Sequence, residues 1–109
     1  MTGKFELYRD KAGSYRYRLK AGNGQVVLTG EGYSSKTACM DGIESVRKNA
    51  QKETAFALYV DKKGEHRFRL KAPNGEIIGH GEGYSSKSGC MKGVTSIMKN
   101  APSSKVVEL

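Results

Sequence analysis

Apolar and polar residues alternate in two short runs near the start of the chain. Residues 5–9 and 15–20 each place an apolar or aromatic side chain at every second position, which is the period of a half-buried β-strand. The turn Asp10-Lys11-Ala12-Gly13 lies between them, so the two runs predict a hairpin. Asn23-Gly24 is a strong hairpin signal, because both residues tolerate a positive φ, and it predicts a third strand over 25–29.

After Tyr33 the spacing of apolar residues changes from two to between three and four. This spacing continues from Ala38 to Ala50 and predicts an amphipathic helix, whose first amides Ser34 or Ser35 can cap. A glycine in mid-helix, as at residue 42, costs about 1 kcal/mol relative to alanine. Close approach of the helix to a sheet would offset that cost.

The same series of elements occurs twice. Displacing the chain against itself by 51 residues aligns 5–50 with 56–101 without a gap, and 27 of these 46 positions are identical. The run Gly-Glu-Gly-Tyr-Ser-Ser-Lys at 30–36 recurs unchanged at 81–87. We predict a single domain, 1–109, made of repeat one (4–51) and repeat two (55–109), because about fifty residues with one helix bury too little core to be stable alone.

These elements predict an α+β fold built from a tandem β-β-β-α(-β) unit. We expect edge strands of the two repeats to join about a pseudo-twofold axis into one antiparallel sheet with both helices on one face. The tail, 105–109, is expected to form one more short strand. The predicted buried face carries Phe5, Leu7, Tyr17, Leu19, Phe56, Leu58, Phe68 and Leu70.

The tandem unit resembles the YegP-like family of small bacterial proteins of unknown function. The resemblance rests on the Asn-Gly hairpin, the Tyr-Ser-Ser-Lys run and the helix Gly42-Ile43-Glu44-Ser45-Val46-Arg47-Lys48-Asn49-Ala50. The second copy matches, with a helix over 93–101 that keeps the same frame, so the resemblance spans about Lys4 to Pro102. It implies an α+β domain in which two units, in tandem or from two subunits, form a single sheet and exchange their C-terminal strands. It brings no established activity.

Two features depart from the family pattern as we expect it. Cys39-Met40 and Cys90-Met91 stand where small or polar residues are expected. Gly79-His80 is expected to interrupt the strand that Leu28-Thr29 continues in repeat one. Both departures concern local packing and strand regularity.

The charge balance favours a polyanionic partner. Nineteen Lys and Arg outnumber eleven Asp and Glu, giving a net charge of +8, to which each repeat contributes half.

No stretch is apolar enough for a membrane span, and no apolar signal region precedes the first strand, so a cytoplasmic location is expected. Two cysteines and two histidines fit neither a disulfide-stapled miniprotein nor a structural zinc site, and we predict no metal or cofactor.

Candidate polyanion-binding residues follow from the alternation in the second strand of each repeat. Its cations face away from the apolar side at intervals of about 6.8 Å, close to the spacing of phosphates along a nucleic-acid strand. Tyrosines of the first strands should face the same side, where they can stack on unpaired bases. The alternative is a solvated sheet face, partly neutralised by Glu6. The predicted set is Arg16, Arg18, Lys20, Arg67, Arg69, Lys71, Tyr8 and Tyr59, with Lys36 and Lys87 extending the surface.

Other motifs favour structural roles. The glycines and serines of the repeated run fit a tight connection into a capped helix better than a phosphate site, although free amides there can hold an anion. Cys39 and Cys90 lie on the apolar helix stripe and fit small buried thiols, with a disulfide or metal pair across the axis as the alternative.

No catalytic constellation is present in the sequence, so we predict no catalytic residues. The favoured function is a non-catalytic module that binds nucleic acid or another polyanion. The alternative is a protein-interaction or oligomerisation module without a nucleic-acid role, suggested by strand edges and the tail. A third hypothesis, a small enzyme or ligand carrier, would use His66, His80 or the Ser-Ser-Lys loop. A monomer with internal pseudo-dimer symmetry is expected.

Overall fold

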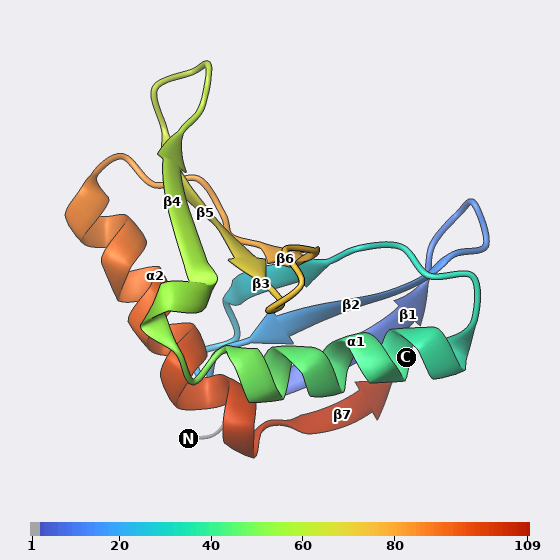
Figure 1. Ribbon diagram of the computed structural model, residues 1–109. Coiled ribbons are helices and arrows are strands. Elements are labelled where there is room, and N and C mark those ends of the chain that lie inside the picture. The colour runs from blue at the N-terminus through green and yellow to red at the C-terminus, as the bar shows by residue number, and fades with distance from the viewer. Residues whose placement is uncertain (1–2) are drawn as a thin grey trace.

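The computed structural model describes residues 3–109, and both repeats fold into the same series of elements (Figure 1). Repeat one contains β1 (Lys4–Arg9), β2 (Tyr15–Lys20), β3 (Val26–Gly30) and α1 (Lys36–Asn49). Repeat two contains β4 (Phe56–Val60), β5 (His66–Lys71), β6 (Ile77–His80) and α2 (Lys87–Asn100). The short 3-10 turns η1 (Glu53–Ala55) and η2 (Ala101–Ser103) follow the helices, and β7 (Lys105–Glu108) is the last strand.

All seven strands form one sheet in the order β4-β5-β6-β3-β2-β1-β7. The repeats join where β3 pairs antiparallel with β6, and Thr29 lies opposite His80. These two residues occupy equivalent positions, 51 apart, so the pseudo-twofold axis passes between them. The predicted fold class is confirmed, and the tail forms a strand as expected. One detail was not anticipated, because β7 runs parallel to β1 whereas every other neighbouring pair is antiparallel.

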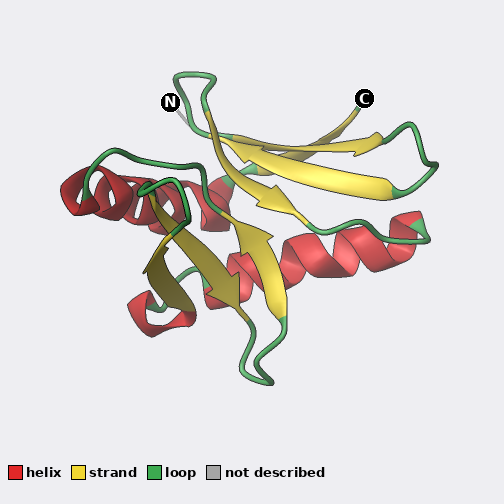
Figure 2. Ribbon diagram, turned by 90° about the horizontal axis from the view of Figure 1, so that it is seen from above, coloured by secondary structure: helices red, strands yellow, loops and turns green. Residues whose placement is uncertain are grey.

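Both helices cover one face of this sheet, and the core lies between them and the strands (Figure 2). Seven of the eight residues predicted for this core are buried, but the prediction for Leu58 is wrong. Its side chain is 38% exposed, whereas that of its counterpart Leu7 is 1% exposed. The physical reason is that β7 covers the edge of β1, while no strand pairs with the outer edge of β4 within residues 3–109.

The strand break expected at Gly79 and His80 does not occur, because β6 continues through both residues. A Cβ atom on Gly79 would lie 2.9 Å from two side-chain carbons of Leu28. Leu28 and Gly79 are equivalent residues that face the same space beside the axis. Only one of them can carry a large side chain, so the glycine makes room for the leucine.

The second serine of the repeated run caps each helix and directly precedes its first residue. The hydroxyl of Ser35 accepts a hydrogen bond from the Ala38 amide at 3.1 Å, and Ser86 caps α2 in the same way. Cys39 and Cys90 are free and fully buried, and burial raises the pKa of both thiols. The run is therefore used here as a helix cap, and the cysteines are used as small core residues.

Candidate polyanion-binding face

The cations of β2 and β5 lie on the face of the sheet opposite the helices. Tyr17 and Leu19 of β2 are buried in the core, so the residues between them point to the other side. Strand pairing continues across the repeats and aligns one residue from each of six strands on this outer face. In order, this row is Ala57, Arg69, His80, Thr29, Arg18 and Glu6.

In repeat one, a single carboxylate on the outer face contacts three cations. Arg18 Nε donates a hydrogen bond to Glu6 Oε1 at 2.7 Å, and the ammonium groups of Lys20 and Lys4 lie 3.2 and 3.5 Å from the same carboxylate. Glu6 is only 4% exposed. The hydrogen bond from Arg18 is the main cause that holds the pKa of Glu6 below its usual range, against the opposing effect of burial. Repeat one therefore resembles the solvated alternative more than a free cationic row.

The first arginine of each row is held by the hairpin turn. Asp10 accepts hydrogen bonds from Arg16 Nε at 2.7 Å and from the amides of Ala12 and Ser14. Asp61 binds Arg67 in the same geometry. The arginine hydrogen bond is the largest cause of a lowered pKa for both aspartates. Both residues therefore serve the turns, as the sequence suggests, and they also occupy Arg16 and Arg67.

Repeat two differs at the position of Glu6, where it carries Ala57. Arg69, the counterpart of Arg18, consequently has no carboxylate within 4.0 Å in the described chain. Its Nε atom is buried and has no hydrogen-bond partner among residues 3–109. Lys71 is exposed and likewise forms no salt bridge there. In repeat two, Arg69 and Lys71 are thus cations of the outer face that lack a carboxylate contact within the described residues.

Both tyrosines lie on the outer face but contact the arginines of their own repeats. The guanidinium carbon of Arg18 lies 4.7 Å from the ring centre of Tyr8, and that of Arg69 lies 4.3 Å from the ring centre of Tyr59. Such cation–π contacts hold the guanidinium groups in place. They also cover one side of each ring, which leaves less aromatic surface for a stacked base.

The structure does not bring Lys36 and Lys87 to this face. Both lie at the starts of helices, on the covered side of the sheet. Lys36 forms a salt bridge with Glu108 of β7, whereas Lys87 has no such partner within residues 3–109. Lys36 therefore belongs to a different surface from the cation rows, whereas Lys87 lines a hollow at the edge of β4 together with Tyr59 and Arg67.

Sequence reasoning did not single out the lysines of the β4–β5 hairpin. Lys62 and Lys63 line a surface hollow of about 540 Å³, whose other lining residues are Tyr59, Val60, Asp61, Arg67 and Arg69. One sequence feature could have pointed to these lysines. Repeat one carries an acid at position 6, whereas the equivalent position 57 of repeat two is an alanine. That difference points to repeat two and to its neighbouring hairpin.

The histidines show no arrangement typical of a metal or catalytic site. His80 Nε2 lies 3.1 Å from Glu31 Oε1, and both side chains are partly exposed. Residues 3–109 contain no group of three or more side chains placed to hold a metal ion. No helix in that part of the chain is long and apolar enough to cross a membrane.

The fold and its duplicated outer face define a protein of two tandem β-β-β-α units. The family model named "Domain of unknown function (DUF1508)" matches residues 10–56 and again residues 61–108. The chain therefore belongs to the DUF1508 family, and its relatives carry the name UPF0339.

Relatives span nearly the whole chain. A UPF0339 protein in the ptx operon 5' region of Stutzerimonas stutzeri is 43% identical and covers 100% of this chain and 98% of that protein. YegP of Yersinia pestis is 39% identical, covering 98% and 96%. A Treponema denticola protein is 64% identical over 50 residues, which are 46% of this chain and 86% of that protein.

Solved structures show the same fold. The solution structure of YegP from E. coli, a protein of unknown function, has a TM-score of 0.94 at 38% identity, covering 99% of this chain and 93% of that one. A UPF0339 protein from Shewanella oneidensis gives 0.92 at 39% identity, covering 100% and 92%. Members of the family are uncharacterised, and their names indicate no catalytic activity.

Proposed function

We propose that the chain is a non-catalytic binding module for phosphate-bearing polyanions, nucleic acid first among them, and that Arg69 and Lys71 form the centre of contact. The observation that carries this proposal is the difference between the two repeats. Glu6 forms salt bridges with Arg18 and Lys20, whereas Ala57 leaves Arg69 and Lys71 without a carboxylate contact. A monomer in the cytoplasm is part of the same proposal.

A phosphate can supply the negative charge that the guanidinium group of Arg69 lacks in repeat two. An arginine guanidinium presents a planar set of donors that matches a phosphate. The stacked ring of Tyr59 fixes the guanidinium of Arg69, which reduces the entropy lost on binding. Lys62, Lys63 and Lys71 supply further positive charge around it.

The test exchanges the equivalent residues of the two repeats. Fluorescence anisotropy with labelled single- and double-stranded RNA and DNA should show binding at about 50 mM salt, with an affinity that falls steeply as salt rises. Ala57→Glu installs the missing carboxylate beside Arg69 and Lys71. We expect it to weaken binding at least roughly tenfold and to flatten the salt slope by about 0.9 for each phosphate that the protein no longer neutralises.

Glu6→Ala is the matched variant, because it releases the cations of repeat one and should strengthen binding. Circular dichroism must show that both variants are folded. If no nucleic acid binds the wild-type chain at about 50 mM salt, or if Ala57→Glu binds as the wild type does, the proposal fails.

A further inference from the structure

The two outer strands of the repeats differ in what covers them. β7 covers β1, while the equivalent edge of β4 is open, so Leu58 and Val60 are 38% and 57% exposed. By correspondence with Leu7, whose carbonyl accepts the Leu109 amide, the backbone N–H and C=O of Leu58 point away from β5 and toward solvent. A free strand edge of this kind is a template for pairing with another chain.

The pairing of β7 with β1 shows which side chains fit beside the first strand of a repeat. β7 runs parallel to β1, with Val106 beside Phe5 and Glu108 beside Leu7. Val106 packs against the core, and Glu108 forms a salt bridge with Lys36 at the start of α1. An apolar side chain followed two residues later by a carboxylate therefore fits the space between the first strand and the helix.

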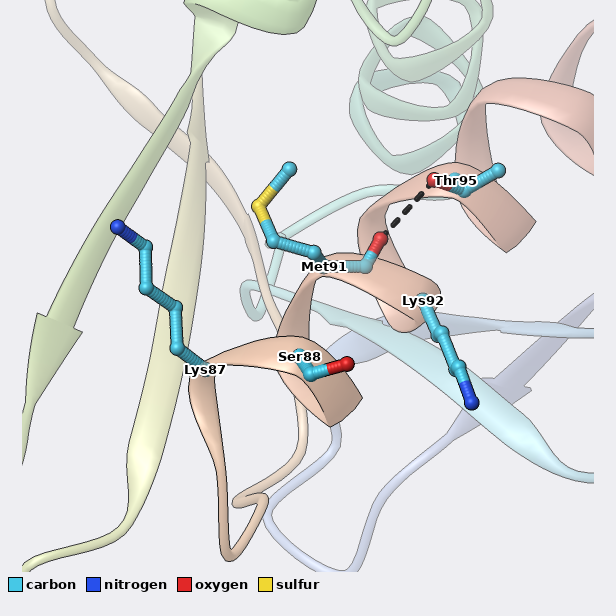
Figure 3. A pocket seen from close by; sticks show the side chains of 5 residues that line it. All are labelled: Lys87, Ser88, Met91, Lys92 and Thr95. Atoms are coloured by element: carbon cyan, nitrogen blue, oxygen red, sulfur yellow. Dashed lines mark hydrogen bonds between the residues drawn. The ribbon is translucent and has the colours of Figure 1, made fainter.

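In repeat two, no segment of residues 3–109 lies along the corresponding edge of β4. Residues 51–55, which follow α1, connect to β4 through η1 and do not return along it. Between β4 and α2 lies a hollow of about 220 Å³, lined by Leu58, Tyr59, Val60, His66, Arg67, Lys87 and Cys90. Lys87 also lines a second hollow, on α2, and extends from the helix on the same side as Met91 (Figure 3). This lysine is the counterpart of Lys36, but it has no carboxylate partner within residues 3–109.

We propose that the β4 edge binds an extended segment of a partner protein as a strand parallel to β4, with a carboxylate of that segment paired to Lys87. The segment would follow the pattern of Val106–Leu109: an apolar residue beside Phe56, any residue, an acidic residue beside Leu58, and an apolar residue. Main-chain hydrogen bonds to Leu58 provide affinity, and the hollow and Lys87 provide specificity. This proposal does not rest on polyanion binding, although Tyr59 and Arg67 line the hollows of both sites.

The probe is a synthetic peptide with the sequence of residues 104–109, Ser-Lys-Val-Val-Glu-Leu, added in millimolar amounts to the isotope-labelled full chain. We expect amide chemical shifts to change at Leu58, Val60 and Lys87. Lys87→Glu should weaken binding roughly fivefold, and a peptide with lysine in place of its glutamate should restore binding to that variant. Lys92→Glu is the matched control, because Lys92 extends from α2 in another direction and should leave the affinity unchanged (Figure 3).

Three outcomes would overturn the proposal. The first is the absence of shift changes along β4 at millimolar peptide. The second is a set of changes confined to β1 and β7, which would mean exchange with the chain's own strand. The third is self-association through β4, seen by analytical ultracentrifugation as a dimer that Lys87→Glu leaves intact, which would make the occupant a second copy.

Discussion

Gly42 and Gly93 each lie opposite the hydroxyl of a tyrosine from the loop that precedes their helix. A Cβ atom at either position would stand 2.4 Å from the hydroxyl oxygen of Tyr33 or Tyr84. The glycines are thus required by a side chain of the connecting loop, and not by the sheet that the sequence led us to expect. Their helix-propensity cost is offset by the burial of an aromatic ring against the helix.

Gly42→Ala should lower the free energy of unfolding by about 1–3 kcal/mol, because the added methyl group displaces the Tyr33 ring, and urea denaturation measures this. Gly89→Ala is the matched control, since repeat one already carries Ala38 at that position. It should raise the free energy of unfolding by up to about 1 kcal/mol. Equal effects of the two substitutions would contradict the steric explanation.

Glu6 predicts an acid-sensitive contribution to stability. Its pKa in the folded chain lies below the ordinary value of 4.5, chiefly because Arg18 donates a hydrogen bond to it. A lowered folded-state pKa stabilises the protein above the unfolded pKa, and this contribution disappears as the pH falls through the folded value. Urea unfolding at neutral pH and at about pH 3 should therefore show a smaller pH dependence for Glu6→Gln than for the wild type. Asp10 and Asp61, whose pKa values are also lowered, should preserve part of the dependence.

At the scale of elements, the hairpins and helices could be predicted because their signals are local. Gly13, Gly24, Gly64 and Gly75 adopt positive φ at the four hairpin turns, and serines cap both helices. Alternation also predicted the correct sheet face for Leu58 but not its burial. Burial depends on whether a distant segment covers the strand edge, and no periodicity within β4 carries that information.

β7 illustrates such a distant contact, and its removal should be measurable. Deleting residues 105–109 removes the strand that covers β1 and the packing of Val106, so we expect a decrease of roughly 2 kcal/mol in the free energy of unfolding. Thermal denaturation with and without the peptide of residues 104–109 checks this, because the added peptide should restore stability. A truncated chain as stable as the full one would show that β7 contributes little to the fold.

At the scale of the whole molecule, the axis between the repeats explains two of the sequence differences between them. Leu28 fills the space that Gly79 leaves, and the Tyr17 hydroxyl donates a hydrogen bond to the Ile78 carbonyl of the other repeat, where the counterpart of Tyr17 is Phe68. The duplication and the joined sheet were predictable, because each repeat alone is too small. The alignment of the repeats already shows Glu6 in one repeat and Ala57 in the other. Only the structure shows that this difference leaves the Arg69 side chain without a carboxylate contact.

The connection through η1 also determines which outer edge of the sheet stays unpaired. Two separate copies of this unit, each lending its last strand to the other, would form a closed pair with both outer edges satisfied. Joining the copies into one chain uses the residues equivalent to the first such strand as a linker, so one outer edge, that of β4, stays open within residues 3–109. Under the strand binding that we propose for β4, one molecule therefore binds one partner segment.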